Sequence, residues 1–216
     1  MGAVRSVVNI GAGTGSYEPT DLDVVAVEPS REMIRQRPES AAPVLQAVAE
    51  QLPFADSSFD LAMGVLTLHH WSDWRQGLAE ASRVAGGNVL LFTWFGDRGD
   101  FWLTDYFPEF ITMDNERFPS RDEYADVLGN LTITPFPLPH DLRDGFMYSY
   151  WRRPEAYLDP GVRQSISSFA LISDPDPGLQ KLEADLASGR WQEKYGDLLT
   201  LEEYDHGYAL VHSHSG

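Results

Sequence analysis

The chain has 216 residues, 43% of them hydrophobic and 23% charged, which is typical of a globular protein with room for one α/β domain. Its formal net charge of −17, from 33 acidic and 16 basic residues, disfavours nucleic acid and anionic lipid as partners, so the expected partner is a small molecule. The absence of cysteine excludes thiolate metal sites, thiol nucleophiles and disulfides, and the lack of a long apolar run or a signal pattern predicts a cytoplasmic protein.

Short apolar runs in the first half of the chain predict buried strands over residues 5–10, 23–27, 44–48, 59–68 and 88–95. These runs are apolar on both faces and alternate with helical segments, which indicates a parallel sheet covered on both sides. Ser30 can cap a short helix that continues through Arg37. A second helix is predicted from Ser72 to Ala85, where Gly86 and Gly87 end it.

The second half has a different character, because residues 101–119 are rich in aromatic side chains. A helix is predicted over 120–130 and a strand over 131–137. Helical segments interrupted by prolines follow over 140–204, and the stretch from His206 to His212 predicts a terminal edge strand. We therefore expect a single domain over 1–216, with a substrate cap inserted at about 97–130 and 138–204.

A glycine-rich loop, Asn9-Ile-Gly-Ala-Gly-Thr-Gly15, follows the first predicted strand. Glycines there permit positive φ angles and let a ligand approach main-chain N–H groups. The dinucleotide fingerprint places its third glycine one position later, where this chain has Ser16, and Pro19 leaves little room for a phosphate-binding helix. A ligand with a ribose but no phosphates, such as S-adenosylmethionine, fits this loop better than NAD does.

Glu28 ends the second predicted strand, after the glycine loop. A carboxylate at that position can accept hydrogen bonds from both hydroxyls of a ribose. The alternative is a solvated loop acid with no ligand.

Four motifs together resemble the class I S-adenosylmethionine-dependent methyltransferases, and among them the UbiE-like, or type 11, group. They are the glycine loop, Val25-Ala-Val-Glu-Pro-Ser30, Ala49-Glu-Gln-Leu-Pro-Phe-Ala-Asp-Ser-Ser-Phe-Asp60 and Val65-Leu-Thr-Leu-His-His-Trp71. The resemblance covers roughly residues 5–95. It implies a Rossmann-like α/β fold whose mostly parallel seven-stranded sheet has an antiparallel last strand and helices on both faces.

The resemblance also implies a site for S-adenosylmethionine, with S-adenosylhomocysteine as product. The implied residues are Asn9, Gly11, Ala12, Gly13, Gly15, Glu28, Pro29, Ser30, Met33, Ala49, Glu50, Leu66 and Thr67. By this resemblance Gly11, Gly13 and Gly15 line the methionine and ribose, and Glu28 binds the ribose diol. Pro29, Ser30 and Met33 flank the adenine, and Ala49 and Glu50 lie at its edge. Leu66 and Thr67 lie near the methionine moiety.

The chain departs from the family pattern at several points. Asn9 stands where an acidic residue is usual, and Val48 stands where the family has an aspartate before Ala49. The helix after the glycine loop is expected to be cut to a turn or two. Family members also carry a helix before the first strand that closes over the ligands. We expect either that this lid lies outside the present sequence or that the cap near 101–160 does its work.

Candidate catalytic residues are His69 and His70, which follow the fourth predicted strand at the carboxyl edge of the sheet. Since the cofactor already carries an activated methyl group, an O or N acceptor needs only positioning and removal of a proton. A histidine suits that task near neutral pH. The alternative is that the pair simply begins a helix and packs beside Trp71.

Residues of the predicted cap offer an aromatic pocket with a cationic rim. The candidates for binding the acceptor are Tyr106, Phe107, His140, Trp151 and Arg152. The alternative is that these side chains form the core of the cap. No metal site is expected, because a frayed tail is the preferred interpretation of His212 and His214.

These features predict a methyltransferase that transfers a methyl group to a small-molecule acceptor. The alternative is a catalytically weak or inactive protein of the same fold that binds a ligand, and an NAD-dependent oxidoreductase is a more distant possibility. The sequence does not identify the acceptor or the oligomeric state.

Overall fold

The computed structural model describes residues 3–96 and 101–214, with only the backbone for 114–117, and the chain divides into two compact units. The first contains 1–95, 118–135 and 209–216, and the second contains 96–117 and 136–208. The residue ranges expected for the cap, 97–130 and 138–204, overlap those of the second unit, whereas residues 118–130 belong to the first unit; a cap role for the second unit stays a prediction.

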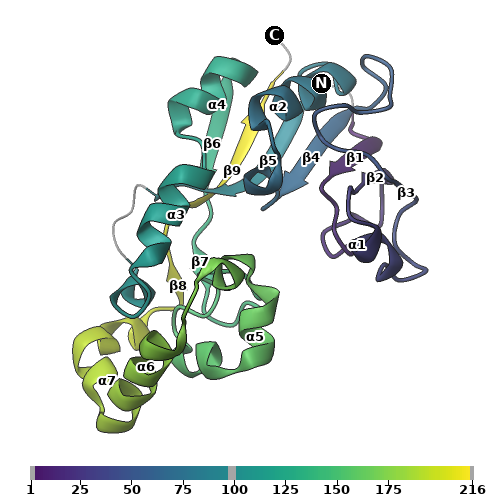
Figure 1. Cartoon of the computed structure of the whole chain (residues 1–216). Helices are drawn as coiled ribbons and strands as arrows, with labels where there is room; N and C mark the ends of the chain where they lie inside the picture. Colours follow the sequence, from purple (N-terminus) through teal and green to yellow (C-terminus); the bar gives the residue numbers. More distant parts are fainter. Residues whose placement is uncertain (1–2, 97–100, 215–216) are drawn as a thin grey trace. The chain divides into compact units, whose positions relative to one another are not determined.

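The first unit is built on a seven-stranded sheet in the order β3-β2-β1-β4-β5-β9-β6 (Figure 1). Its strands are β1 (Ser6–Ile10), β2 (Asp23–Val27), β3 (Val44–Leu45), β4 (Leu61–Val65), β5 (Val89–Trp94), β6 (Leu131–Pro135) and β9 (Tyr208–Ser213). β1 to β5 pair in parallel, and β6 pairs antiparallel with β9. The expectation of a mostly parallel seven-stranded sheet with an antiparallel strand is confirmed.

The helices of this unit are α1 (Arg31–Arg35), α2 (Trp74–Val84) and α4 (Arg121–Leu128). The apolar face of α2 buries Leu78, Ala81 and Val84 in one cluster with Val8 and Ile10 of β1. Tyr124 of α4 joins the same cluster, so α2 and α4 pack together on one face of the sheet. Asp73 and Ser120 cap these two helices, as their side chains accept backbone N–H groups of the first turn.

The prediction of a terminal edge strand is wrong, because β9 lies between β5 and β6. The Ser213 hydroxyl accepts a hydrogen bond from the Val89 N–H at 3.1 Å and donates one to the Gly87 carbonyl at 2.8 Å. A frayed tail is also wrong for His212, whose Nε2 lies 2.8 Å from the Asn88 side-chain oxygen. Pairing with β6 on one side and contacts with the β5 side on the other hold this end of the chain in the sheet.

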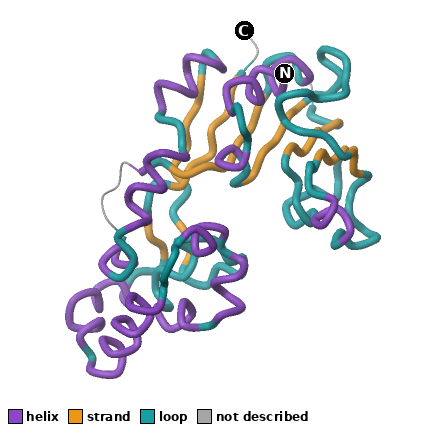
Figure 2. Tube along the Cα trace, in the orientation of Figure 1, coloured by secondary structure: helices purple, strands orange, loops and turns teal. Residues whose placement is uncertain are grey.

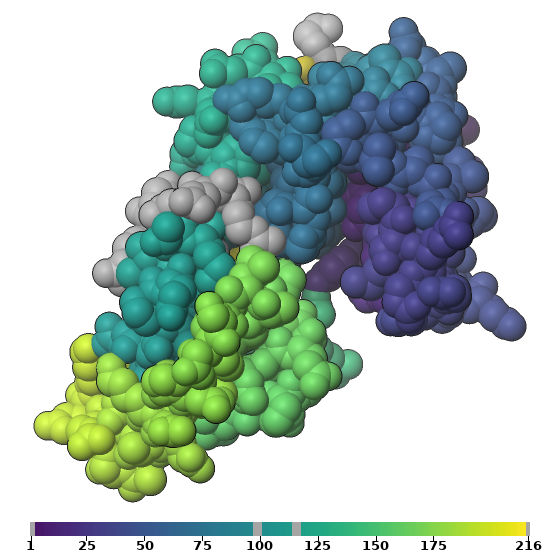
Figure 3. Space-filling view, viewed as in Figure 1, coloured from purple at the N-terminus to yellow at the C-terminus, as the bar shows by residue number. Residues whose placement is uncertain are grey.

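The second unit is mainly helical, as Figure 2 shows by its purple segments joined by loops. Its elements are α3 (Glu109–Arg117), α5 (Pro160–Ser165), α6 (Asp176–Ser188) and α7 (Arg190–Tyr195), with a small antiparallel pair of β7 (Leu138–Pro139) and β8 (Glu203–Tyr204). The side chains of α6 and α7 form one continuous surface in Figure 3, in yellow-green.

Aromatic side chains form the core of the second unit. The Trp102 ring meets the Trp191 ring edge to face at a centroid distance of 5.3 Å, and its N–H donates to the Trp151 carbonyl at 2.9 Å. Phe107 and Phe169 pack in the same manner at 5.1 Å. Edge-to-face contacts of this kind add to the burial of large rings and fix their orientation.

No helix in the described part of the chain is long and apolar enough to cross a membrane. Within the same residues there is no group of three or more histidine, aspartate or glutamate side chains placed to hold a metal ion.

Candidate cofactor site

The glycine loop turns sharply at the carboxyl end of β1. Gly11, Gly13 and Gly15 have φ angles of +69°, +55° and +92°, which L side chains rarely adopt. The N–H groups of Gly11 and Ala12 both donate to the carbonyl of Val27, at 2.8 and 3.1 Å. These bonds tie the start of the loop to the end of β2, where Glu28 follows.

Glu28 is almost completely buried, with 6% of its surface exposed. Its Oε2 accepts a hydrogen bond from the Gly13 N–H at 2.8 Å, and its Oε1 accepts one from the Ser30 N–H at 2.8 Å. An ionised carboxylate can accept about four hydrogen bonds, so acceptor capacity remains on each oxygen. The alternative of a solvated loop acid is wrong, because the structure holds this carboxylate in one orientation beside the glycine loop.

On its other side, the glycine loop packs against Thr67, which follows β4. A Cβ added at Gly11 would lie 1.9 Å from the Thr67 Oγ1, so the loop packs here only because Gly11 has no side chain. The Trp71 indole N–H donates to the same hydroxyl at 3.2 Å. Leu66, just before, has a φ of +48°, a strained conformation for a residue other than glycine. The strain falls where the resemblance places the methionine moiety.

The segment after β3 is fixed to α2. Ala49 is buried, and Glu50 accepts hydrogen bonds from the Ser72 hydroxyl at 2.8 Å and the Asp73 N–H at 3.0 Å. Partial burial tends to raise the pKa of the Glu50 carboxyl, but these hydrogen bonds outweigh it and hold the pKa below its ordinary value. The Glu50 carboxylate is therefore engaged at the start of α2.

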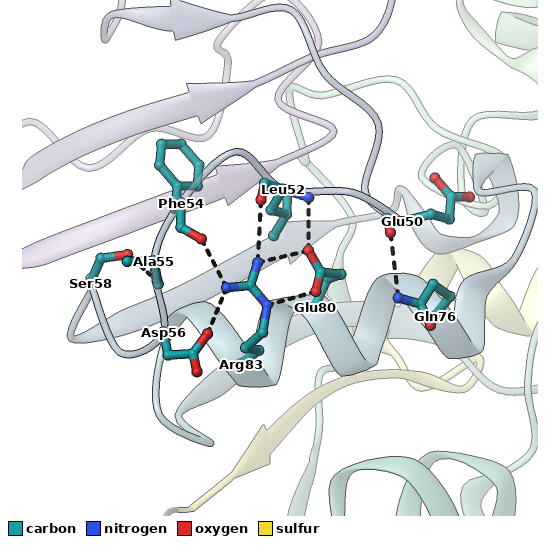
Figure 4. A network of polar contacts seen from close by, with 9 residues as sticks. All are labelled: Glu50, Leu52, Phe54, Ala55, Asp56, Ser58, Gln76, Glu80 and Arg83. Atoms are coloured by element: carbon teal, nitrogen blue, oxygen red, sulfur yellow. Dashed lines mark hydrogen bonds and ion pairs between the residues drawn. The ribbon is translucent and has the colours of Figure 1, made fainter.

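Arg83 of α2 binds the loop that follows Glu50, from Leu52 to Asp56 (Figure 4). Its guanidinium donates to the carbonyls of Leu52 and Phe54, at 3.2 and 2.8 Å, and pairs with Asp56 and Glu80. The Glu80 carboxylate accepts the Leu52 N–H at 2.9 Å, and its bond with Arg83 lowers the pKa of Glu80 despite some burial. This network fixes the backbone between Ala49 and β4.

The two candidate catalytic histidines form a single 3₁₀ turn, Leu68–His70, after β4. His69 is half-buried and its ring lies 4.8 Å from that of Phe118 and 4.0 Å from that of His70, between centroids. His70 is exposed. The turn places both at the carboxyl edge of the sheet, as expected, and a catalytic role for either stays a prediction.

The candidate cofactor residues on α1 and just before it are more open. Ser30 caps the helix, since its hydroxyl accepts the Met33 N–H at 3.3 Å, and Met33 itself is 44% exposed. Pro29 precedes the cap and its carbonyl accepts a hydrogen bond from the Gln46 amide at 3.0 Å. Val48, the departure noted above, is 46% exposed and offers no hydrogen-bond acceptor in its side chain.

The five candidates for acceptor binding all lie in the second unit, where three of them are buried. Trp151 is fully buried and donates to the Leu138 carbonyl at 3.1 Å, and Phe107 is 1% exposed. The Tyr106 hydroxyl donates to Asp185 at 3.1 Å, and burial together with the Asp185 carboxylate raises the pKa of Tyr106 above its ordinary value. For these three side chains the geometry favours the alternative, that they form the core of the cap.

The remaining two candidates have polar ends that solvent reaches. His140 Nε2 lies 3.2 Å from a carboxylate oxygen of Glu202, and Arg152 donates to the Leu201 carbonyl at 2.8 Å. The Arg152 and His140 side chains keep 27% and 37% of their surface exposed. They are the members of the predicted rim that could meet a solute.

The polar residues that brace the candidate site were not predicted from the sequence. Glu80 and Arg83 are three apart on α2, a spacing that pairs side chains on a helix, so this pair could have been found. Glu18 and Arg37 form a buried ion pair although they are nineteen residues apart in sequence, and no local sequence pattern predicts such a contact.

Comparisons with known proteins agree with this geometry. Residues 8–93 match a family model described as methyltransferase domain. A solved structure from Anabaena variabilis, described as a methyltransferase from an antibiotic biosynthesis pathway, is 37% identical with a TM-score of 0.91, and the match covers 99% of this chain and 92% of that one.

Two curated relatives match over shorter stretches. The uncharacterized methyltransferase YcgJ of Bacillus subtilis is 31% identical over 60% of this chain and 49% of its own length. The demethylmenaquinone methyltransferase of Renibacterium salmoninarum is 35% identical over 42% of this chain and 43% of its own. The matches thus span less than half the length of these relatives.

The fold, the glycine loop with Glu28, and the solved relative together define a class of protein. The chain belongs to the methyltransferase-domain family, within the class I S-adenosylmethionine-dependent methyltransferases, and the cofactor of this class is S-adenosylmethionine.

The residues present fit that cofactor. Glu28 is held with spare acceptor capacity for ribose hydroxyls, and a Cβ built at Gly13 would meet no atom within 4 Å, so the space in front of the loop is open. The Glu28 carboxylate and the backbone N–H groups of the glycine loop carry no positive charge, which suits a ligand that has no phosphate.

Proposed function

We propose that this protein transfers a methyl group from S-adenosylmethionine to a small-molecule acceptor. The observation that carries the proposal is the Glu28 carboxylate, buried at the end of β2 and oriented by the N–H groups of Gly13 and Ser30. The acidic net charge of −17 supports an acceptor that is not a nucleic acid. The demethylmenaquinone in the name of the Renibacterium relative is said of that protein, and related isoprenoid quinones or their reduced forms are one candidate acceptor class here.

In this proposal Glu28 holds the ribose, and the glycine loop lies against the methionine portion. When bound, the cofactor supplies a methyl group already activated on a sulfonium centre. The protein then needs to orient the acceptor, exclude water and take up a proton from an O–H or N–H group. We assign proton uptake to His69 or His70, and acceptor recognition to the second unit, where His140 and Arg152 present exposed polar ends.

The binding step is tested by isothermal titration with S-adenosylhomocysteine. Hydrogen bonds to a charged group contribute about 1.5–3 kcal/mol, so Glu28→Ala should weaken binding roughly tenfold to a hundredfold. Glu32→Ala is the matched control, because Glu32 is an exposed glutamate on α1 whose side chain pairs with Arg35 and Gln36. Absence of binding by the wild-type protein would overturn the proposal.

Turnover is tested by measuring S-adenosylhomocysteine release with panels of phenols, quinols and amines. His69→Asn and His70→Asn should then differ: the residue that takes up the proton lowers kcat when replaced, with little change in cofactor affinity. Equal kcat values for both variants and the wild type would remove the histidines from the mechanism.

A second function is favoured by specific departures in the site. Val48 offers no acceptor, and no helix follows the glycine loop, since β1 connects directly to β2. These features suit a protein that binds the cofactor or its product without turnover. Binding of S-adenosylhomocysteine combined with no turnover across the whole panel would support this alternative over the enzyme.

A further inference from the structure

The connection between β1 and β2 is unusual for parallel strands. Such crossovers normally contain a helix, which packs on the sheet and holds the loop at its start. Here residues 11–22 contain turns and bends, and no helix. Something other than a helix must hold the glycine loop against β2.

A buried ion pair occupies this region. Glu18, within the connection, pairs with Arg37, which follows α1, and their side chains are only 7% and 4% exposed. Both also bind the backbone of Ala42: Glu18 Oε2 accepts its N–H at 2.8 Å, and Arg37 Nη2 donates to its carbonyl at 3.0 Å. The pair therefore joins the connection to the segment that leads into β3.

The same arginine reaches the glycine loop. Arg37 Nη1 donates to the carbonyl of Gly13 at 3.1 Å, while the N–H of Gly13 donates to Glu28 at 2.8 Å. A Cβ built at Gly15 would lie 3.2 Å from Glu18 and 3.3 Å from the Arg37 guanidinium carbon, so the pair packs against this glycine. Gly13 is thus held at both of its peptide groups, by Glu28 on one side and by Arg37 on the other.

We infer that the Glu18–Arg37 pair positions the glycine loop for the cofactor, in the place of the missing helix. Buried ion pairs add little net stability compared with apolar side chains of similar size, but they fix geometry. A planar guanidinium can donate to three acceptors at once, here Glu18, Ala42 and Gly13, and this sets the direction of the Gly13 peptide. The inference rests on the proposed cofactor site, and both residues are positioning residues that act through Gly13.

The test compares three variants with the wild type. The double variant Glu18→Gln/Arg37→Met removes both charges and so leaves no buried charge unpaired. Arg37→Lys keeps the charge but replaces the planar fork with a single ammonium. The control is Glu32→Gln/Arg35→Met, which removes an exposed ion pair from α1, whose side chains are 64% and 70% exposed.

Three measurements are made on the full chain: thermal unfolding, titration with S-adenosylhomocysteine, and hydrogen exchange of the Gly13 amide by NMR. The double variant is expected to unfold within a few degrees of the wild type, to bind at least tenfold more weakly, and to exchange the Gly13 amide faster without ligand. Arg37→Lys should fall between, and the control should match the wild type in all three.

Several outcomes would overturn the inference. A folded double variant that binds as tightly as the wild type and protects Gly13 equally shows that the pair does not position the loop. Equal losses in the exposed control pair would show a general effect of charge on α1. If the wild type does not bind S-adenosylhomocysteine, the proposed function fails, and the exchange of the Gly13 amide still decides whether the pair holds the loop.

Discussion

The conformation of the glycine loop leads to a prediction that separates binding from stability. Gly13 and Gly11 both have positive φ angles, but their surroundings differ. A Cβ at Gly13 would meet nothing within 4 Å, while one at Gly11 would lie 1.9 Å from the Thr67 hydroxyl oxygen. We therefore expect Gly13→Ala to impair cofactor binding with a small loss of stability, and Gly11→Ala to impair stability strongly.

The magnitudes follow from the two environments. Placing alanine in the left-handed region costs about 1–2 kcal/mol, part of which is offset because alanine restricts the unfolded chain. For a chain of this size a loss of about 1 kcal/mol lowers Tm by roughly 2–4 °C, which is the expected effect of Gly13→Ala. Gly11→Ala adds the displacement of Thr67, and overpacking of this kind costs a further 1–3 kcal/mol, about as much again or more.

The assay pairs thermal unfolding with titration of S-adenosylhomocysteine for each variant. The added methyl group of Gly13→Ala would occupy the open space in front of the loop, so binding should weaken at least tenfold. Its N–H still reaches Glu28, so the effect reports on space and not on a lost hydrogen bond. Unchanged affinity in Gly13→Ala would refute the assignment of that space to the cofactor, and equal destabilisation of both variants would refute the argument from packing.

Three further predictions concern the surrounding structure. Burial lowers the pKa of His206 to about 4 from an ordinary value of 6.5, so its neutral form stabilises the fold above pH 6.5. About 3 kcal/mol of that stability should be lost as the pH falls toward 4, and urea unfolding of His206→Phe should show a flatter pH profile; an equally steep profile would contradict the role of His206. Gly77→Ala would place a Cβ 2.4 Å from the Trp71 ring, so urea unfolding should show a loss of about 1–3 kcal/mol, whereas Gly196→Ala, with open space around it, should be nearly neutral. Arg83→Met removes the guanidinium that binds the loop after β3 (Figure 4), and proteolysis of residues 50–58 should become faster; an unchanged cleavage rate would contradict the bracing role.

The parallel strands could be predicted from sequence because they are apolar on both faces. Val7, Val8 and Ile10 of β1 are each at most 1% exposed, a pattern that only a sheet with both faces covered produces. The position of β9 could not be predicted, since its order in the sheet depends on contacts such as that of Ser213 with Gly87 and Val89, which are distant in sequence. Alternation along β9 indicated a strand but not its neighbours.

The candidate site shows the same limit. Glu28 was identified because it ends a strand, and strand ends at the carboxyl edge lie close together in a parallel sheet. Arg37 was assigned only to the end of a helix, because its buried partner Glu18 lies in the connection between β1 and β2. Whether the aromatic residues of the second unit are buried could not be predicted from the sequence either, since residues such as Trp151 and Tyr106 can form the wall of a pocket or the core of a domain.

Two glutamates of the site lead to a last prediction, because the structure gives them different tasks. Glu28 is oriented by backbone N–H groups and keeps acceptor capacity, whereas the Glu50 carboxylate binds Ser72 and Asp73 at the start of α2. Glu28→Gln should therefore weaken S-adenosylhomocysteine binding by tenfold or more. It should also lower the free energy of unfolding by about 1–3 kcal/mol, because the amide NH2 cannot accept one of the two backbone N–H bonds. Glu50→Gln should lower the free energy of unfolding by about 1 kcal/mol, as the loss of a helix cap does, and leave the affinity within about twofold of the wild type. Because the pKa of Glu50 lies below its ordinary value, its stabilising effect should be present at neutral pH and disappear in acid as the carboxyl is protonated. A large loss of affinity in Glu50→Gln would show that the loop after β3 also contacts the cofactor through this side chain.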